Sequence, residues 1–208
     1  MSTAEFSALE SAIDYLKQGL MNFSSRDDGN YTVEELLKCQ AFVVFSHAEI
    51  EVYLEKVSRK IMTSAQDAWR SNSIYGRVIS ALVAFRSQGH SSVPNDPKIC
   101  NRHNDIEKII EQTFIAQEEI ISKNNGIKRS NLAQMIFPLG VLSRDIDETL
   151  LILLDNTGAK RGEIVHKASR VSLGKVRDPF TDELSDIYDL ISEISVFDNK
   201  IVDLFGIA

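Results

Sequence analysis

The sequence has few of the residues that stabilise small secreted proteins or β-sheets. It contains two cysteines, Cys39 and Cys100, four prolines and one tryptophan in 208 residues. Two cysteines cannot build a disulfide framework, so we expect both to be reduced thiols in a cytoplasmic protein. The alternation of apolar and polar residues that indicates β-strands is absent over any convincing length. These absences favour an all-α fold.

Long apolar runs are missing as well. No run of about 18 apolar residues occurs, which excludes an obvious membrane-spanning helix. The first twenty residues lack a basic start followed by an apolar block, so we expect no secretory signal. No repeat of 20–50 residues and no low-complexity tract is visible. We therefore expect a protein in the cytoplasm that has no membrane partner.

Basic residues are outnumbered by acids, and the formal net charge is −7. This balance argues against broad, nonspecific adhesion to nucleic acid. Residues 160–177 are the exception, because they contain six Lys or Arg and a single acid, Glu163. Two interpretations stay open for this basic segment: a solvated loop with chance charges, or a surface that binds an anion.

Apolar residues recur at helical spacing along most of the chain. The spacings of Ser2 and Glu5, and of Thr32 and Glu35, are typical of capping boxes that begin helices. The helix expected after Thr32 is long and apolar on a wide face, which predicts a central helix buried on more than one side. We predict a bundle of about six helices, with residues 1–31 forming an N-terminal helix and loop that pack on a main domain of residues 32–208.

The stretch from Leu150 to Arg170 combines an apolar run with a basic segment. Two interpretations of Gly158 stay open. It breaks the helix before Arg161 and His166, or it and Gly162, four residues on, leave one helix face without side chains, which permits close approach of another helix backbone or of a phosphate. Histidine titrates near neutral pH and can move protons, while arginine offers a planar fork of donors to a phosphate. Residues five apart lie about 140° apart around a regular helix. The two side chains would therefore converge only if the helix is irregular near Gly158 or if two copies of the chain meet there.

A second histidine occurs in the long helix. Glu51 follows His47 by one turn, so the two side chains share a face. A buried histidine with its hydrogen bonds satisfied is the plainer interpretation, and a supporting role at a site is the alternative.

An arginine and a histidine suit RNA cleavage without a metal. The 2′-hydroxyl of RNA can attack the adjacent phosphate if one group removes its proton, another protonates the leaving 5′-oxygen, and a cation neutralises the phosphorane. One histidine and one arginine are short of this set. A second copy of the site would supply the missing groups.

Four sequence blocks together resemble the HEPN superfamily of helical ribonucleases, and most closely its RiboL-PSP-HEPN branch. The blocks are Ala48-x-Ile50-Glu51-x-x-Leu54, Asn125-Gly-Ile-Lys-x-x-Asn-Leu132, Pro138-Leu-Gly140 and Arg161-Gly-Glu-Ile-Val-His166, and the resemblance covers roughly residues 34–200.

The resemblance implies a helical bundle and a homodimer whose Arg-x4-6-His motifs face each other. It also implies a metal-independent endoribonuclease that leaves a 2′,3′-cyclic phosphate and a 5′-hydroxyl, without a cofactor or metal. Arg161 and His166 would be catalytic. A toxin or phage-defence or RNA-stress system, with an antitoxin or defence-system partner, is the expected setting.

Further residues would support this site. We expect Glu163, Glu51 and His47 to assist the catalytic pair, and Lys160, Lys167 and Arg170 to contact RNA.

Two departures from the family pattern keep other functions open. Gly162 follows Arg161 where many active members have Asn, Asp or His, and Val165 precedes His166 where Ala is frequent. A noncatalytic module that binds RNA or protein is therefore the alternative. A metal-dependent hydrolase built from Glu49, Glu51, Asp145 and Asp147 is a weaker hypothesis, because the Glu-x-x-His spacing of di-metal bundles is absent.

Overall fold

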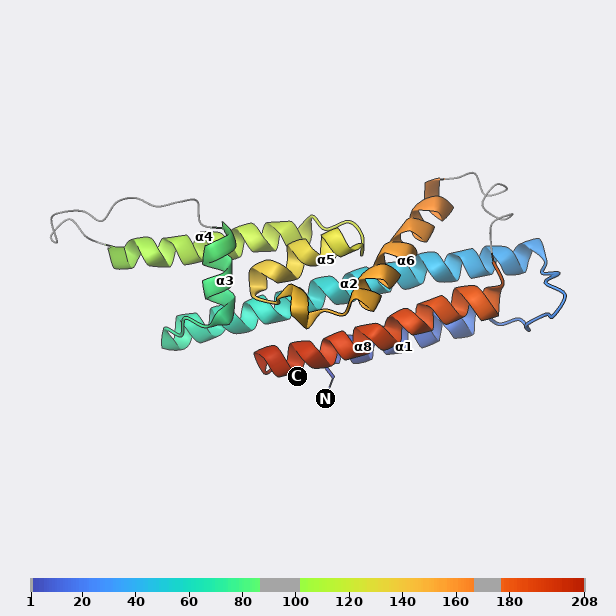
Figure 1. Cartoon of the computed structure of the whole chain (residues 1–208), viewed down its shortest axis with the longest axis horizontal. Coiled ribbons are helices and arrows are strands. Elements are labelled where there is room, and N and C mark those ends of the chain that lie inside the picture. The colour runs from blue at the N-terminus through green and yellow to red at the C-terminus, as the bar shows by residue number, and fades with distance from the viewer. Residues whose placement is uncertain (1, 87–101, 167–176, 208) are drawn as a thin grey trace.

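The chain forms an all-α bundle arranged along one long helix (Figure 1). The computed structural model describes residues 2–86, 102–166 and 177–207, and these contain seven α-helices and no strand. The predicted all-α class is confirmed. The helices are α1 (Ala4–Leu20), α2 (Val33–Asn72), α3 (Arg77–Arg86), α4 (Arg102–Ser122), α5 (Arg129–Ile136), α6 (Glu148–His166) and α8 (Ser185–Phe205), with 3₁₀ segments η1 (Phe137–Leu139) and η2 (Ser143–Asp145) and a π-helical segment η3 (Pro179–Leu184).

Helix α2 is the 40-residue spine of the molecule. It begins with the predicted capping box: the Glu35 amide donates to the Thr32 hydroxyl at 3.2 Å, and the Thr32 amide donates to the Glu35 carboxylate at 2.7 Å. Buried side chains lie along its whole length, so it is central as predicted. It ends at Ser73, whose φ of 52° is left-handed and stops the helix.

Helices α1 and α8 pack side by side along one flank of α2, which brings both chain ends close together (Figure 1). The expected cap at Ser2 is wrong, because the side chain of Thr3 caps α1 by accepting from the Phe6 amide. Thr3 also binds the fully buried Asp198 of α8 through its amide at 2.7 Å and its hydroxyl at 2.6 Å. The Tyr53 hydroxyl of α2 donates to the same carboxylate at 2.9 Å. One carboxylate thus ties together three helices.

Helices α3, α4 and α5 cover the opposite flank of α2, and α6 crosses over it (Figure 1). Helix α5 ends before the Pro138–Gly140 turn, as predicted. Gly140 there adopts a φ of +93° and lies against Arg77 of α3. Of the two interpretations of Gly158, the helix break is wrong, since α6 runs without interruption from Glu148 to His166. Buried Leu154 and Thr157 precede Gly158 in the helix, and their packing offsets the cost of about 1 kcal/mol for a glycine inside a helix.

The hydrophobic core runs through every layer. Phe6, Leu9 and Ile13 of α1 belong to the same buried cluster as residues of α2, α6 and α8. A boundary between residues 31 and 32 stays a prediction. Helix α1 nevertheless shares the core of the main bundle.

Candidate functional site

Both motif residues lie on the second half of α6, whose C-terminal end rises away from α2 (Figure 1). Along this uninterrupted helix, five residues correspond to a rise of about 7.5 Å and a rotation of about 140°. Arg161 and His166 of one chain therefore do not converge. Of the two conditions for convergence, an irregular helix is excluded, and a second copy of the chain remains.

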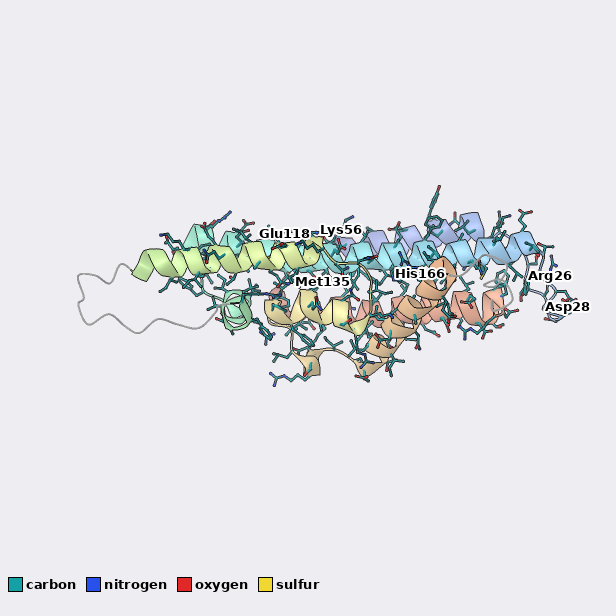
Figure 2. The ribbon with its side chains drawn as sticks, turned by 90° about the horizontal axis from the view of Figure 1, so that it is seen from above. Arg26, Asp28, Lys56, Glu118, Met135 and His166 are labelled. Atoms are coloured by element: carbon teal, nitrogen blue, oxygen red, sulfur yellow. The ribbon has the colours of Figure 1, made fainter. Side chains whose placement is uncertain are left out.

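His166 ends α6 and is exposed (Figure 2). Arg161 is half-buried where α6 passes α2. Within the described residues, neither side chain takes part in a hydrogen bond or an ion pair, so both can meet a ligand. Lys167 and Arg170, two of the residues expected to contact RNA, lie outside the described residues.

His47 of α2 is buried beneath the motif, with a residue exposure of 3%. Burial and then the positive charge of Arg161 lower the pKa of His47 to about 4. The imidazole is therefore neutral near neutral pH. His47 is thus not a second cation near Arg161.

Glu51 lies one turn beyond His47, with its Oε2 atom 3.9 Å from His47 Nδ1. Its other oxygen accepts a hydrogen bond from the Gly126 amide at 2.5 Å and from the Asn124 side chain at 3.4 Å. Glu51 thereby fixes the turn between α4 and α5 to α2. The structure brings Arg161, His47 and Glu51 into one region, while Glu163 is exposed on α6.

The same turn also holds α6. Lys128 covers Gly158 so closely that a Cβ atom there would lie 2.9 Å from Lys128 Cγ. The next residue, Arg129, donates its amide to Asp155 of α6 at 3.0 Å and its side chain to the same carboxylate. The blocks containing Glu51, Lys128 and Arg161, which are far apart in the chain, therefore meet where α6 crosses α2.

Lys160 is partly buried, and its ammonium binds two acids that follow the basic segment. Its ammonium lies 2.6 Å from Glu183 and 3.1 Å from Asp186, and Glu183 has a side-chain exposure of only 5%. Arg177 pairs with the same two carboxylates. Two of the six cations of the basic segment are thus neutralised, and contact of Lys160 with RNA stays a prediction. Sequence patterns did not reveal these acids, because 23 to 26 residues separate them from Lys160.

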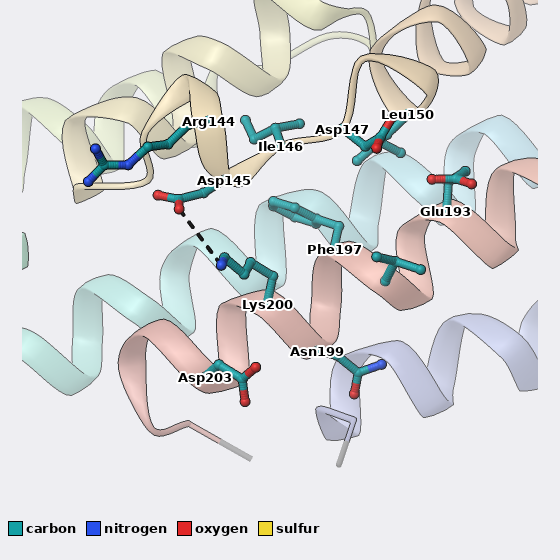
Figure 3. A pocket seen from close by; sticks show the side chains of 11 residues that line it. Arg144, Asp145, Ile146, Asp147, Leu150, Glu193, Phe197, Asn199, Lys200 and Asp203 are labelled. Atoms are coloured by element: carbon teal, nitrogen blue, oxygen red, sulfur yellow. Dashed lines mark ion pairs between the residues drawn. The ribbon is translucent and has the colours of Figure 1, made fainter.

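The acids considered for a metal site occupy different surroundings. Asp145 and Asp147 line a groove of about 420 Å³ between η2 and α8, where Lys200 lies 3.9 Å from Asp145 (Figure 3). Glu49 and Glu51 do not line this groove, and Glu51 is bound to the turn after α4. Across the described part of the chain, no three His, Cys, Asp or Glu residues are grouped as metal ligands. No helix of that part is long and apolar enough to cross a membrane.

The chain is an all-α bundle that carries an arginine and a histidine on α6, a helix whose C-terminal end extends away from α2 (Figure 1). The family model RiboL-PSP-HEPN matches residues 5–205, almost the whole chain, and the chain belongs to this family. Comparisons with curated proteins and with solved structures return no match. Membership supports a function in RNA cleavage or RNA binding, and HEPN domains often dimerise.

Proposed function

We propose that this protein is a metal-independent endoribonuclease whose active site forms between two copies of the chain. The observation that carries the proposal is the uninterrupted α6, which presents Arg161 and His166 unpaired by other described residues and on diverging faces. Within a single chain, Arg161, which would bind the phosphate, and His166, which would transfer the proton, point in directions about 140° apart around the helix axis. They cannot act on the same phosphate. Two α6 helices that meet near their C-terminal ends would place Arg161 of one chain opposite His166 of the other.

The reaction needs no group outside the RNA and these side chains. One His166 takes the proton of the 2′-hydroxyl, whose oxygen then bonds to the adjacent phosphorus. The bond from phosphorus to the 5′-oxygen breaks, and the same imidazole, which now carries the proton, donates it to that oxygen, so that one His166 acts in turn as base and acid. Arg161 binds the nonbridging oxygens and stabilises the charge that develops on them. The products are a 2′,3′-cyclic phosphate and a 5′-hydroxyl.

The surface of α6 suits a second copy. Val165, directly before His166, is an exposed apolar side chain with 49% exposure. A Cβ atom at Gly162 would have no atom within 4 Å, so this turn leaves room for another backbone. We infer that Gly162 and Val165 lie in the interface between the two chains.

A toxin or phage-defence or RNA-stress role is part of this proposal. The net charge of −7 repels bulk RNA, and Lys160 and Arg177 are already paired. A low basal rate on bulk RNA follows, which suits an enzyme restrained by an antitoxin or another partner.

The test compares the unaltered protein with His166→Ala on mixed RNA in EDTA. We expect the unaltered protein to produce cyclic-phosphate ends and the variant to lose this activity by at least about 100-fold, as for loss of a proton-transfer group. Equal cleavage by both proteins, or no cleavage by the unaltered protein without a divalent metal, would refute the proposal.

A noncatalytic RNA-binding module is the second candidate function. The observation that favours it is Gly162, which offers no polar side chain beside Arg161. This alternative predicts RNA binding that His166→Ala leaves unchanged, with no new product ends. The comparison in EDTA distinguishes the two functions, because only the enzyme generates 5′-hydroxyl fragments.

A further inference from the structure

A second hollow lies where α4 meets α5, outside the Arg161 and His166 motif. It encloses about 500 Å³, within the range of cavities that hold small ligands. We name it the amide pocket, after the carboxamide side chains that line it. Its lining residues are Arg86, Ala116, Glu119, Ile120, Lys123, Asn124, Asn125, Asn131, Gln134 and Met135.

The free amides of this pocket suit the edge of a nucleobase. The side chains of Asn125 and Gln134 are exposed and form no hydrogen bond with the described residues. A carboxamide places a donor and an acceptor in one plane, and base edges present the matching pair. Ala116, Ile120 and the buried Met135 supply apolar walls for the flat faces of a base.

The cations of the pocket are held in place or neutralised. Arg86 donates to the Gln117 amide oxygen at 3.2 and 2.7 Å, and Gln117 is fully buried and bonded to two carbonyls of α5. Arg86 therefore has a set orientation at the rim. Lys123 pairs with Glu119 at 2.5 Å. One oriented arginine with several amides favours a base over a purely anionic ligand such as free phosphate.

Hydrogen bonds connect the pocket to Glu51, which lies next to His47. Asn131 donates to Asn124 at 3.1 Å, and Asn124 donates to Glu51, one turn from His47. His47 in turn lies within the electrostatic influence of Arg161. The turn that forms one wall of the amide pocket is therefore the turn that Glu51 holds against α2.

We propose that the amide pocket binds one unpaired base of the RNA strand whose phosphate is held at Arg161, and so gives cleavage a base preference. This inference rests on the proposed function. Its ligand is a nucleobase within single-stranded RNA, recognised by Asn125 and Gln134 through hydrogen bonds to the base edge.

The test measures RNA binding where cleavage cannot interfere. In a His166→Ala background with EDTA, we would measure the Kd of four labelled eight-nucleotide homopolymers by fluorescence anisotropy. We expect one homopolymer to bind roughly tenfold more tightly than the weakest, the discrimination typical of paired hydrogen bonds to a base edge. The double variant Asn125→Ala and Gln134→Ala should abolish this preference. Gln112→Ala, an exposed amide of α4 outside the pocket, serves as the matched control and should retain it.

Equal affinity for all four homopolymers, or a preference that survives the double variant, would overturn the inference. A free nucleoside monophosphate that binds the pocket more tightly than the eight-nucleotide RNA would also overturn the inference. The ligand of the pocket would then be a free nucleotide and not a base within an RNA strand. The cleavage assay is separate. Cleavage without base preference refutes only the proposal that the amide pocket binds a base, and base-selective binding without cleavage refutes only the proposal that the protein is an endoribonuclease.

Discussion

At the scale of single residues, His47 carries a titratable ring into the interior beside Arg161. Its pKa is about 4 in the folded protein and near 6.5 in an unfolded chain. Between these values the unfolded state binds the proton more readily. The free energy of unfolding therefore falls as pH falls from about 6.5 to about 4, and His47 destabilises the fold at acidic pH.

We predict that His47 accounts for about 2 to 3 kcal/mol of the stability lost between pH 7.5 and pH 4. His47→Gln is neutral at every pH and should remove this part of the loss. Urea unfolding of both proteins at several pH values measures it. The exposed His166→Gln is the control, and identical pH dependence for the unaltered protein and His47→Gln would contradict the assignment.

Asp198 is a second residue whose contacts define its effect. Its carboxylate accepts three hydrogen bonds, two from Thr3 and one from Tyr53, in a fully buried setting. Asp198→Asn should lower the free energy of unfolding by about 2 to 3 kcal/mol, because a carboxamide has one acceptor oxygen in place of the two carboxylate oxygens that accept from Thr3 and Tyr53. Chemical denaturation checks this value. Asp203→Asn, an exposed change on the same helix, should stay within about 0.5 kcal/mol.

The residues of the motif could be located from the sequence, but their surroundings could not. Arg161 and His166 are close in the chain and share a recognisable spacing. The partners of Lys160 are Glu183 and Asp186, which approach only because α8 packs against α6. Likewise, the pairing of Glu51 with Gly126 depends on tertiary contact across 75 residues. Local patterns carry no information about such pairs.

At the scale of elements, capping chemistry was predictable and helix continuity was not. Thr32 and Glu35 form the expected capping box since both groups are local to the helix start. At the N-terminus, two neighbouring hydroxyl residues could each cap, and buried Asp198 selects Thr3. Gly158 lies inside α6 because the turn carrying Lys128 and Arg129 packs on that helix. The helix propensity of glycine, on which the sequence prediction rests, takes no account of such a tertiary contact.

The two glycines of α6 should respond differently to alanine. A Cβ atom at Gly162 meets open space, so Gly162→Ala should raise the free energy of unfolding by about 0.5 to 1 kcal/mol through helix propensity. At Gly158 the new methyl group meets Lys128, and this gain should be absent. Urea unfolding of the monomer at low concentration measures both.

A double-mutant cycle separates propensity from contact at Gly158. In a Lys128→Ala background, Gly158→Ala should recover the stabilisation seen at Gly162, giving a coupling of at least about 0.5 kcal/mol. Additive effects of the two substitutions would contradict the close approach of Lys128 to α6.

At the scale of the whole molecule, the proposal requires two chains. We predict that the unaltered protein is a dimer at micromolar concentration and that Val165→Asp shifts it to the monomer, because a carboxylate would be buried in the interface. Analytical ultracentrifugation measures this shift. Val196→Asp, on an exposed site of α8, is the control and should leave the dimer intact. If the unaltered protein stays monomeric and still cleaves RNA, the proposal of an active site shared between two chains is wrong.

Complementation tests the shared site most directly. Arg161→Ala and His166→Ala should each be inactive alone. After mixing and exchange of subunits, a mixed dimer has Arg161 of one chain facing His166 of the other. The mixture should recover roughly a quarter of the unaltered activity, since half of the dimers are mixed and each retains one of two intact pairs. A mixture that forms mixed dimers but stays as inactive as its two components, while the unaltered protein cleaves RNA in EDTA, would contradict the proposal that Arg161 and His166 act across two copies of α6.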